Sequence, residues 1–277
     1  MILFFSCSKK RESDLPRLIG AISDDDIEVN SKEMLNVYVF NPLAFNFTKN
    51  TIIKDISKRY DSVRVVKIPF DSVVPKFDLK VFIDTTYIIS NSHYEHKFVS
   101  RPDPNHIVIN GMINNKIPNE FETIKANNIL FEYINKVSEL REDKVKCLPV
   151  LVLNNSNEYT CLKVEFIQEA KDIDGKWKPI EFTFEYEMCG TGKQFQSILD
   201  PKKYAAFSMI KYFGDFKTKI RVKLKNNNHI YYSNEISGKI NRSQFNKDFC
   251  NSFLESYGSN IDKSEYDYYK KAMYLEN

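Results

Sequence analysis

The feature that most constrains this sequence is a two-residue alternation of apolar and polar side chains, repeated in segments between residues 148 and 245. In the clearest segment, every second residue is apolar: Ile180, Phe182, Phe184, Tyr186 and Met188. Successive side chains of a β-strand point to opposite faces of its sheet, so this pattern predicts half-buried strands. About seven such segments with turns between them predict an antiparallel β-sandwich domain over residues 146–245.

The first predicted hairpin has its turn at Gly175, which can take the left-handed conformation that closes a short loop. A one-residue slip would turn one apolar face toward water, so both strands must keep their apolar faces on the same side. Together with a three-residue loop Ile173–Gly175, this condition places Phe166 opposite Phe182 on the inner face and Lys163 opposite Glu185 on the outer face. Aromatic pairs and opposite-charge pairs of this kind stabilise a ladder.

A second hairpin follows, because residues 216–224 alternate between apolar and mostly cationic side chains and are followed by three asparagines at 226–228. Asparagine tolerates a left-handed backbone better than most residues, so the three asparagines predict the turn. The expected register places Leu224 opposite Ile230 and Lys219 opposite Glu235.

Several short motifs in this region carry a family resemblance. They are Gln168-Glu-Ala-Lys-Asp, Gly175-Lys-Trp-Lys-Pro-Ile-Glu, Cys189-Gly, Gly214-Asp-Phe-Lys-Thr-Lys-Ile-Arg, Tyr232-Ser-Asn-Glu, Gly238-Lys-Ile-Asn and Gln244-Phe. The series resembles an uncharacterised family of Bacteroidota envelope proteins over residues 148–245, and a weaker similarity to the same family extends upstream. The resemblance implies a cell-envelope location and a β architecture. It implies no activity and carries over no site residue.

The flanking regions have less regular patterns. Residues 34–145 contain short apolar runs broken by prolines, which predicts a less regular, mainly β domain. Apolar residues at helical spacing over Phe121–Leu140 predict a helix that links the two halves. After Phe245, aromatic residues recur every four positions, which predicts a short helical tail over residues 246–277.

The N-terminus predicts a lipid anchor. Phe5-Ser6-Cys7 followed by Ser-Lys-Lys looks like the end of a bacterial lipoprotein signal, in which the cysteine carries the lipid. The stretch before Cys7 is shorter than a full signal, so residues 1–33 are expected to be a truncated signal and a flexible tether. Cys7 would be the sole attachment to a membrane, on the periplasmic or outer-membrane face. The alternative is an ordinary N-terminus with a free thiol.

Charge and its distribution bear on the partners. The 40 basic and 37 acidic residues leave a net charge of +3, which gives no indication of a nucleic-acid partner. Four cations nevertheless share one strand face: Lys217, Lys219, Arg221 and Lys223. This row is the predicted binding site, for anionic groups of a lipid, a polysaccharide or an envelope protein. The alternative is a solvated face that Glu235 and the glutamates of strand 180–188 neutralise.

The sequence gives little indication of a metal site, a bound cofactor or a disulfide bond. His93, His96 and His106 lie close in sequence, but their proline-rich surroundings and spacing argue against a zinc site. No metal and no cofactor are predicted. Cys161 and Cys189 would be diagonal neighbours in the first hairpin, farther apart than a disulfide comfortably spans, although an oxidising envelope leaves that bridge open.

The overall expectation is a non-catalytic envelope lipoprotein that serves as a binding or structural module. The alternative is an envelope glycan hydrolase or a carbohydrate-binding accessory protein. A hydrolase needs two carboxylates near an aromatic-lined cleft. Its candidate residues are Trp177, Tyr186, Tyr231, Glu181 and Glu187.

Overall fold

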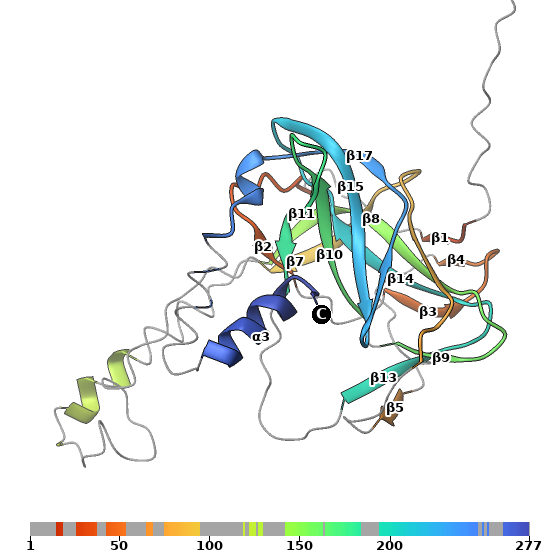
Figure 1. Ribbon diagram of the computed structural model, residues 1–277, viewed down its shortest axis with the longest axis horizontal. Helices are drawn as coiled ribbons and strands as arrows, with labels where there is room; N and C mark the ends of the chain where they lie inside the picture. The colour runs from red at the N-terminus through yellow and green to blue at the C-terminus, as the bar shows by residue number, and fades with distance from the viewer. Residues whose placement is uncertain are drawn as a thin grey trace, which may run out of the picture.

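The computed structural model of this chain is mainly β (Figure 1). It describes residues 15–18, 26–37, 43–53, 65–68, 75–94, 119, 122–125, 127–129, 142–162, 164–183, 194–248, 251, 254 and 263–276. Cys7, His96, His106 and Cys189 therefore lie outside the described residues, as does most of the expected linking helix. The expected tether, residues 1–33, lies outside them only in part: Leu18 is 1% exposed, and Ile27 and Val29 form β-bridges with Val145 and Tyr212, so the described part of this range belongs to the folded body.

Two antiparallel sheets dominate the described part of the chain. Sheet I has the order β11 (Trp177–Pro179), β10 (Val164–Lys171), β15 (Phe216–Asn226) and β16 (His229–Tyr232), and β17 (Ile236–Ile240) also pairs with β15. Sheet II has the order β3 (Ala44–Phe47), β14 (Tyr204–Ile210), β8 (Glu142–Asn154) and β6 (Leu79–Ile83), and β7 (Ile89–Tyr94) also pairs with β8.

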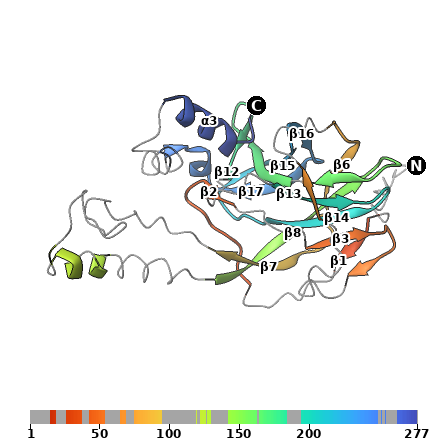
Figure 2. The ribbon, with the colours of Figure 1, turned by 90° about the horizontal axis from the view of Figure 1, so that it is seen from below.

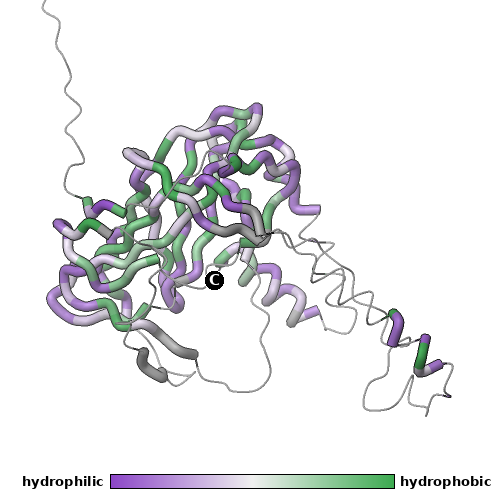
Figure 3. The backbone as a smooth tube through the Cα atoms, turned by 180° about the vertical axis from the view of Figure 1, so that it is seen from behind, coloured by the Kyte–Doolittle hydropathy of each residue, from purple (hydrophilic) through white to green (hydrophobic). Residues whose placement is uncertain are grey.

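The two sheets face each other across one apolar core, which confirms the predicted β-sandwich. Figure 2 shows them as layers, with β15 and β17 above β8 and β14. Phe166 of sheet I meets Phe207 of sheet II edge to face, with 6.0 Å between ring centroids. Ile220 and Val222 of β15 share this core with Val150 of β8. In Figure 3, apolar and polar stretches alternate along the strands, whereas the C-terminal helix is mostly hydrophilic.

Sheet II is covered on its second face as well. Cys147, Leu151 and Tyr204 pack there with Leu18 and Phe47, which come from the N-terminal part of the chain. Tyr204 stacks on Phe47 with 5.9 Å between ring centroids. The second part of β8, from Cys147 to Leu153, is therefore buried on both faces, which explains why this part of its sequence is apolar without alternation.

Shorter pairings complete the β structure. Strand β12 (Glu181–Phe182) runs parallel to β2 (Leu35–Asn36), and β1 (Arg17–Leu18) runs parallel to β4 (Ile52–Ile53). Strand β13 (Gln194–Leu199) lies between β5 (Val65–Ile68) and β9 (Thr160–Leu162).

The expected boundary between residues 145 and 146 falls inside β8. Strands β3, β6 and β7 come from the range 34–145, yet they share sheet II with β14. The long apolar strand β8 needs partners on both edges and cover on both faces, and residues on either side of the expected boundary provide them.

The register of the first hairpin is confirmed near its turn. Gly175 has φ of 76°, and Glu169 pairs with Pro179 as the Gly175 turn requires. Farther from the turn the prediction is wrong, because the ladder between β10 and β11 ends at Glu169 and Pro179, and Phe182 belongs to β12, which pairs with β2. Lys163 and Glu185 lie outside the described residues.

The second hairpin has the expected alternation but a register that differs by one residue. Asn226 pairs directly with His229, so the turn holds only Asn227, at φ of 54°, and Asn228. Leu224 consequently pairs with Tyr231 rather than Ile230. Lys219 pairs with Ser237 of β17 rather than with Glu235.

A short helix, α3 (Lys263–Met273), lies within the predicted helical tail, after the 3₁₀ turn η2 (Arg242–Phe245). Its end packs against the sandwich, because Met273 and Tyr274 form a buried cluster with Met34, Phe182 and Leu254. Residues 122–125 and 127–129 are helical, within the predicted linking helix. Among the described helices, none is both long and apolar enough to cross a membrane.

Candidate functional site

The predicted cation row lies on the outer face of β15, but its four members are in different environments. Lys217 and Lys219 are exposed. The side chains of Arg221 and Lys223 are only 19% and 12% exposed. The row therefore divides into an exposed half and a packed half.

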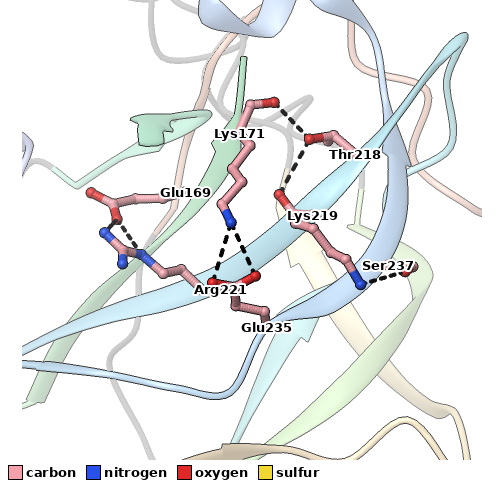
Figure 4. Close-up of polar contacts among 7 residues, drawn as sticks. All are labelled: Glu169, Lys171, Thr218, Lys219, Arg221, Glu235 and Ser237. Carbon is pink, nitrogen blue, oxygen red and sulfur yellow. Dashed lines mark hydrogen bonds and ion pairs between the residues drawn. The ribbon is translucent and has the colours of Figure 1, made fainter. Parts of the chain in front are cut away.

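Arg221 is held on three sides. Its Nε donates a hydrogen bond to Glu169 Oε2 at 2.8 Å, and a terminal nitrogen lies 2.7 Å from the same oxygen (Figure 4). The guanidinium carbon lies 4.2 Å from the centroid of the Trp177 ring and 3.9 Å from that of Tyr232. Such stacking is favourable because the aromatic face is negative. Arg221 thus ties β10, β11, β15 and β16 together.

Lys223 links the end of the chain at Tyr274 to sheet I by a hydrogen bond. Its Nζ donates to the backbone carbonyl of Tyr274 at 2.9 Å and lies 3.9 Å from Glu169 Oε1. Burial lowers the pKa of Lys223, and the nearby Glu169 carboxylate opposes that effect. The structure gives Lys223, like Arg221, intramolecular partners.

The exposed half of the row has weaker partners. Lys219 Nζ donates to Ser237 Oγ at 3.1 Å, as Figure 4 shows. Lys217 pairs across the ladder with another cation, Lys239 of β17. Within the described ranges, none of these three lysines forms an ion pair. Glu235, the expected neutralising residue, lies 3.2 Å from Lys171 instead.

Of the residues nominated for a hydrolase, the three that the structure describes lie in separate environments. Trp177 stacks on Arg221 at the surface, whereas Tyr231 is buried and donates its hydroxyl to the carbonyl of Phe77 at 3.0 Å. Glu181 is 2% exposed and lies in the interior. Tyr186 and Glu187 lie outside the described residues.

Sequence reasoning missed a buried polar cluster made of Gln168, Glu181 and Tyr212. Glu181 Oε2 accepts the backbone N–H of Gln168 at 2.8 Å. Its Oε1 accepts Gln168 Nε2 at 2.7 Å and the Tyr212 hydroxyl at 2.6 Å. Burial raises the pKa of Glu181 to about 7, although these three donors act in the opposite direction. Glu181 therefore changes its charge near neutral pH.

Gln168 has one acceptor left over. Its Nε2 also donates to the carbonyl of Ile210 at 3.0 Å, which uses both amide protons and fixes the orientation of the side chain. Its Oε1 is buried and has no hydrogen-bond partner among the residues that the structure describes. A buried acceptor without a partner is uncommon and calls for an explanation.

A pocket of about 450 Å³ lies beside this cluster, between the two sheets. Its apolar walls come from both of them, and Gln168 and Tyr212 are among its lining residues. Glu28, Lys211, Lys217 and Lys239 are also among its lining residues. Lys211 forms an ion pair with Glu28. Lys217 and Lys239 have the outward parity of their strands, so their side chains belong to the outer face of sheet I.

Cysteine and metal chemistry add no further site in the described ranges. No group of three or more His, Cys, Asp or Glu side chains there is arranged to hold a metal ion. Cys147 and Cys161 are free buried thiols, and burial raises the pKa of Cys147 to about 12. Cys161 is buried in β9, which pairs with β13 and not with the second strand of the first hairpin, so the expected hairpin position of Cys161 is wrong.

Comparison with known protein families, with curated proteins and with solved structures found no match to this chain. What the chain does is therefore inferred from its own residues.

Proposed function

We propose that this chain is a non-catalytic binding module of the bacterial cell envelope, anchored through lipid on Cys7. In this proposal, the outer face of sheet I binds phosphate or carboxylate groups of an envelope ligand. One observation carries it: Lys217 and Lys239 lie directly opposite each other on β15 and β17, with Lys219 next along the same face. Like charges at paired ladder positions destabilise a sheet, so their presence favours an anionic ligand.

Not all four residues of the predicted cation row are available to bind an anionic ligand. Arg221 and Lys223 already have carboxylate and carbonyl partners within the chain. Lys217, Lys219 and Lys239 are exposed. The proposed binding surface, called the lysine face below, therefore consists of these three lysines rather than the original row of four.

The test is binding to vesicles that contain phosphatidylglycerol and, separately, to dextran sulfate, for the wild type and for the triple variant Lys217→Ser, Lys219→Ser, Lys239→Ser. A lysine near an anionic surface contributes about 1 kcal/mol, so the triple variant should bind about 100-fold more weakly. Added salt should weaken wild-type binding. The two probes separate a lipid surface from a soluble polyanion.

The matched control replaces three other exposed lysines, Lys80, Lys144 and Lys263, with serine, which removes the same charge. This control should retain binding to within about twofold, because net charge alone has little effect on a local site. Equal binding by the wild type and the triple variant would show that the lysine face is only a solvated surface.

The lipid anchor has an independent test. Mass spectrometry of the N-terminal peptide from protein made in an envelope-bearing bacterium should show acyl chains on Cys7, and Cys7→Ser should release the protein from the membrane fraction. A Cys7 peptide of unmodified mass would contradict the anchor and leave the lysine-face experiment unaffected.

A further inference from the structure

We infer that the end of sheet I beside the lysine face docks onto an anionic lipid bilayer, with Ile173 and Phe213 placed among the lipid head groups. In this arrangement the three lysines contact the lipid phosphates. The inference rests on the proposed function and selects its ligand, which is a lipid surface rather than a polysaccharide or a protein.

Ile173 is held at the tip of the β10–β11 hairpin with its side chain in solvent. It is 76% exposed, which makes it the most exposed large apolar side chain in the part of the chain that the structure describes. The tip is well fixed, because one carboxylate oxygen of Asp172 accepts the backbone N–H groups of Asp174 at 3.0 Å and of Lys176 at 2.9 Å. Turns are normally built from polar residues and glycine. A β-branched apolar residue presented on such a tip favours contact with an apolar phase.

The hairpin tip lies next to the lysine face. The Thr218 hydroxyl of β15 donates a hydrogen bond to the backbone carbonyl of Lys171 at 2.6 Å (Figure 4). Strand β15 is antiparallel to both β10 and β17, so the end of β10, the start of β15 and the end of β17 lie at the same end of sheet I. Ile173 follows Lys171 by two positions, and Lys217 and Lys219 flank Thr218. The exposed isoleucine and these lysines consequently belong to one end of one sheet.

Phe213 adds a second exposed apolar side chain at this end. It is 46% exposed, and its ring centroid lies 6.0 Å from Nζ of Lys239, the lysine-face residue of β17. Its backbone N–H donates to the carbonyl of Val29 at 3.0 Å. The next residue, Gly214, lies so close to the end of β17 that an added Cβ would overlap the Ile240 carbonyl. Phe213 is therefore held beside the end of β17, next to the lysine face.

The combination of apolar and basic side chains selects a lipid surface. Interfacial segments place apolar side chains at the boundary between head groups and acyl chains, and lysines beside anionic lipids. The exposed acidic residues nearby do not cancel the lysines, because Asp174 is offset by Lys176 at the tip, and Asp215 offsets only one of the three lysines. A soluble polyanion binds through the lysines alone, which gives no reason for Ile173 and Phe213 to be exposed.

The test compares vesicles that contain phosphatidylglycerol with dextran sulfate, on the full chain carrying Cys7→Ser so that no acyl group contributes. In this background, Ile173→Ser and Phe213→Ser should each weaken vesicle binding about fivefold, and the double variant about 30-fold, because each removes apolar surface from the bilayer. Binding to dextran sulfate should stay within about twofold. Circular dichroism checks folding, and the highly exposed Ile173 keeps the test decisive if Phe213→Ser disturbs the fold.

The matched control replaces two other exposed apolar residues, Ile52 of β4 and Tyr159, which lie outside sheet I, with serine. They are 55% and 63% exposed. Vesicle binding by this control should remain within about twofold of the parent, because scattered surface apolar residues do not form a docking site. A folded Ile173→Ser, Phe213→Ser variant that binds vesicles as tightly as the parent would overturn the inference.

Trp177 offers a direct readout of docking, because it is the only tryptophan in the sequence and pairs with Lys171 just after the hairpin tip. Phosphatidylglycerol vesicles with bromine atoms on the acyl chains near the head groups should quench its fluorescence, whereas dextran sulfate should not. At the lowest lipid concentration that saturates the parent, quenching should be largely lost in the Ile173→Ser, Phe213→Ser variant. Equal emission with brominated and unbrominated vesicles would contradict insertion of this end.

Failure of this inference can be told from failure of the proposed function. If the variant Lys217→Ser, Lys219→Ser, Lys239→Ser loses binding to both probes while the Ile173→Ser, Phe213→Ser variant loses neither, the lysine face binds anions without apolar insertion, and this inference alone fails. If the lysine variant keeps both probes, the proposed function fails and this inference fails with it. Loss of vesicle binding in the apolar variant, with dextran sulfate binding retained, supports the inference.

Discussion

Arg221 lies directly opposite Glu169 across β15 and β10, and its guanidinium is bound by that carboxylate and stacked between Trp177 and Tyr232. The pair joins the hairpin β10–β11 to the hairpin β15–β16. A planar guanidinium can make this combination of contacts, whereas an ammonium group cannot.

Arg221→Lys should therefore destabilise the protein although it keeps the charge. Loss of the forked hydrogen bonds and of the stacking should lower the free energy of unfolding by about 2 kcal/mol, measured by urea denaturation. Lys219→Ser, on the same face of the same strand, should change it by less than about 0.5 kcal/mol. Similar losses in both variants would contradict a special role for Arg221.

Glu181 should make stability depend on pH near neutrality. Its pKa is raised from 4.5 to about 7 in the folded protein, so the folded state keeps a proton that the unfolded state releases. This contribution is fully present below pH 4.5 and is lost as pH rises to about 7, with a total on the order of 3 kcal/mol.

Urea denaturation of the wild type and of Glu181→Gln at several pH values between about 4.5 and 8 measures this contribution. The difference between the two free energies of unfolding should fall as pH rises over that interval. The comparison uses the slope, since glutamine also disturbs the hydrogen bonds from Gln168 and Tyr212. Parallel curves would mean that Glu181 does not titrate there.

Gly214 should not tolerate a side chain. An added Cβ would overlap the backbone carbonyl of Ile240, which belongs to β17 and has no flexible group to move aside. Gly214→Ala should lower the free energy of unfolding by about 2 kcal/mol or more. Gly175→Asn is the control, because open space surrounds Gly175 and asparagine accepts its left-handed backbone. Thermal unfolding of the two variants should separate them clearly.

Cys147 should be unreactive until the protein unfolds. It is buried within sheet II, and burial raises its pKa to about 12, so almost no thiolate is present at pH 8. Treatment with iodoacetamide followed by peptide mass spectrometry should find Cys147 unmodified in the native protein and fully modified in urea. Rapid labelling of the native protein would show that sheet II opens readily.

The fold class could be predicted because β15 follows a strict two-residue pattern, and the structure buries Ile220, Val222 and Leu224 as that pattern requires. The Gly175 turn also determined its local register correctly. The register of the second hairpin was wrong because three consecutive asparagines do not show which of them form the turn. The structure uses Asn227 and Asn228 and leaves Asn226 in the ladder.

The alternation around Glu181 was misleading for a different reason. Glu181 was expected on the outer face, but Ile180, Glu181 and Phe182 are all buried because β12 leaves the hairpin and pairs with β2. Hydrogen-bond donors from Gln168 and Tyr212 satisfy the buried carboxylate. Only the tertiary structure brings these residues together.

The candidate sites could be predicted only in part. The outward position of the cation row followed from its spacing, but the contacts of Arg221 with Glu169 and of Lys223 with Tyr274 join residues about fifty positions apart. The lining of the pocket extends from Glu28 to Lys239. No local pattern indicates such an assembly.

The placement of β8 at the centre of sheet II imposes an order on synthesis and folding. One edge of β8 is occupied by β14, and β14 in turn carries β3, whose residues precede it by about 160 positions. Contacts between such distant parts of a chain form slowly. While the ribosome is still translating residue 200, β6 and β7 can already pair with β8, but the other edge of β8 and the strand β3 stay unpaired until β14 emerges. An unpaired edge of an apolar strand is prone to aggregation, so the nascent chain is most vulnerable in this interval.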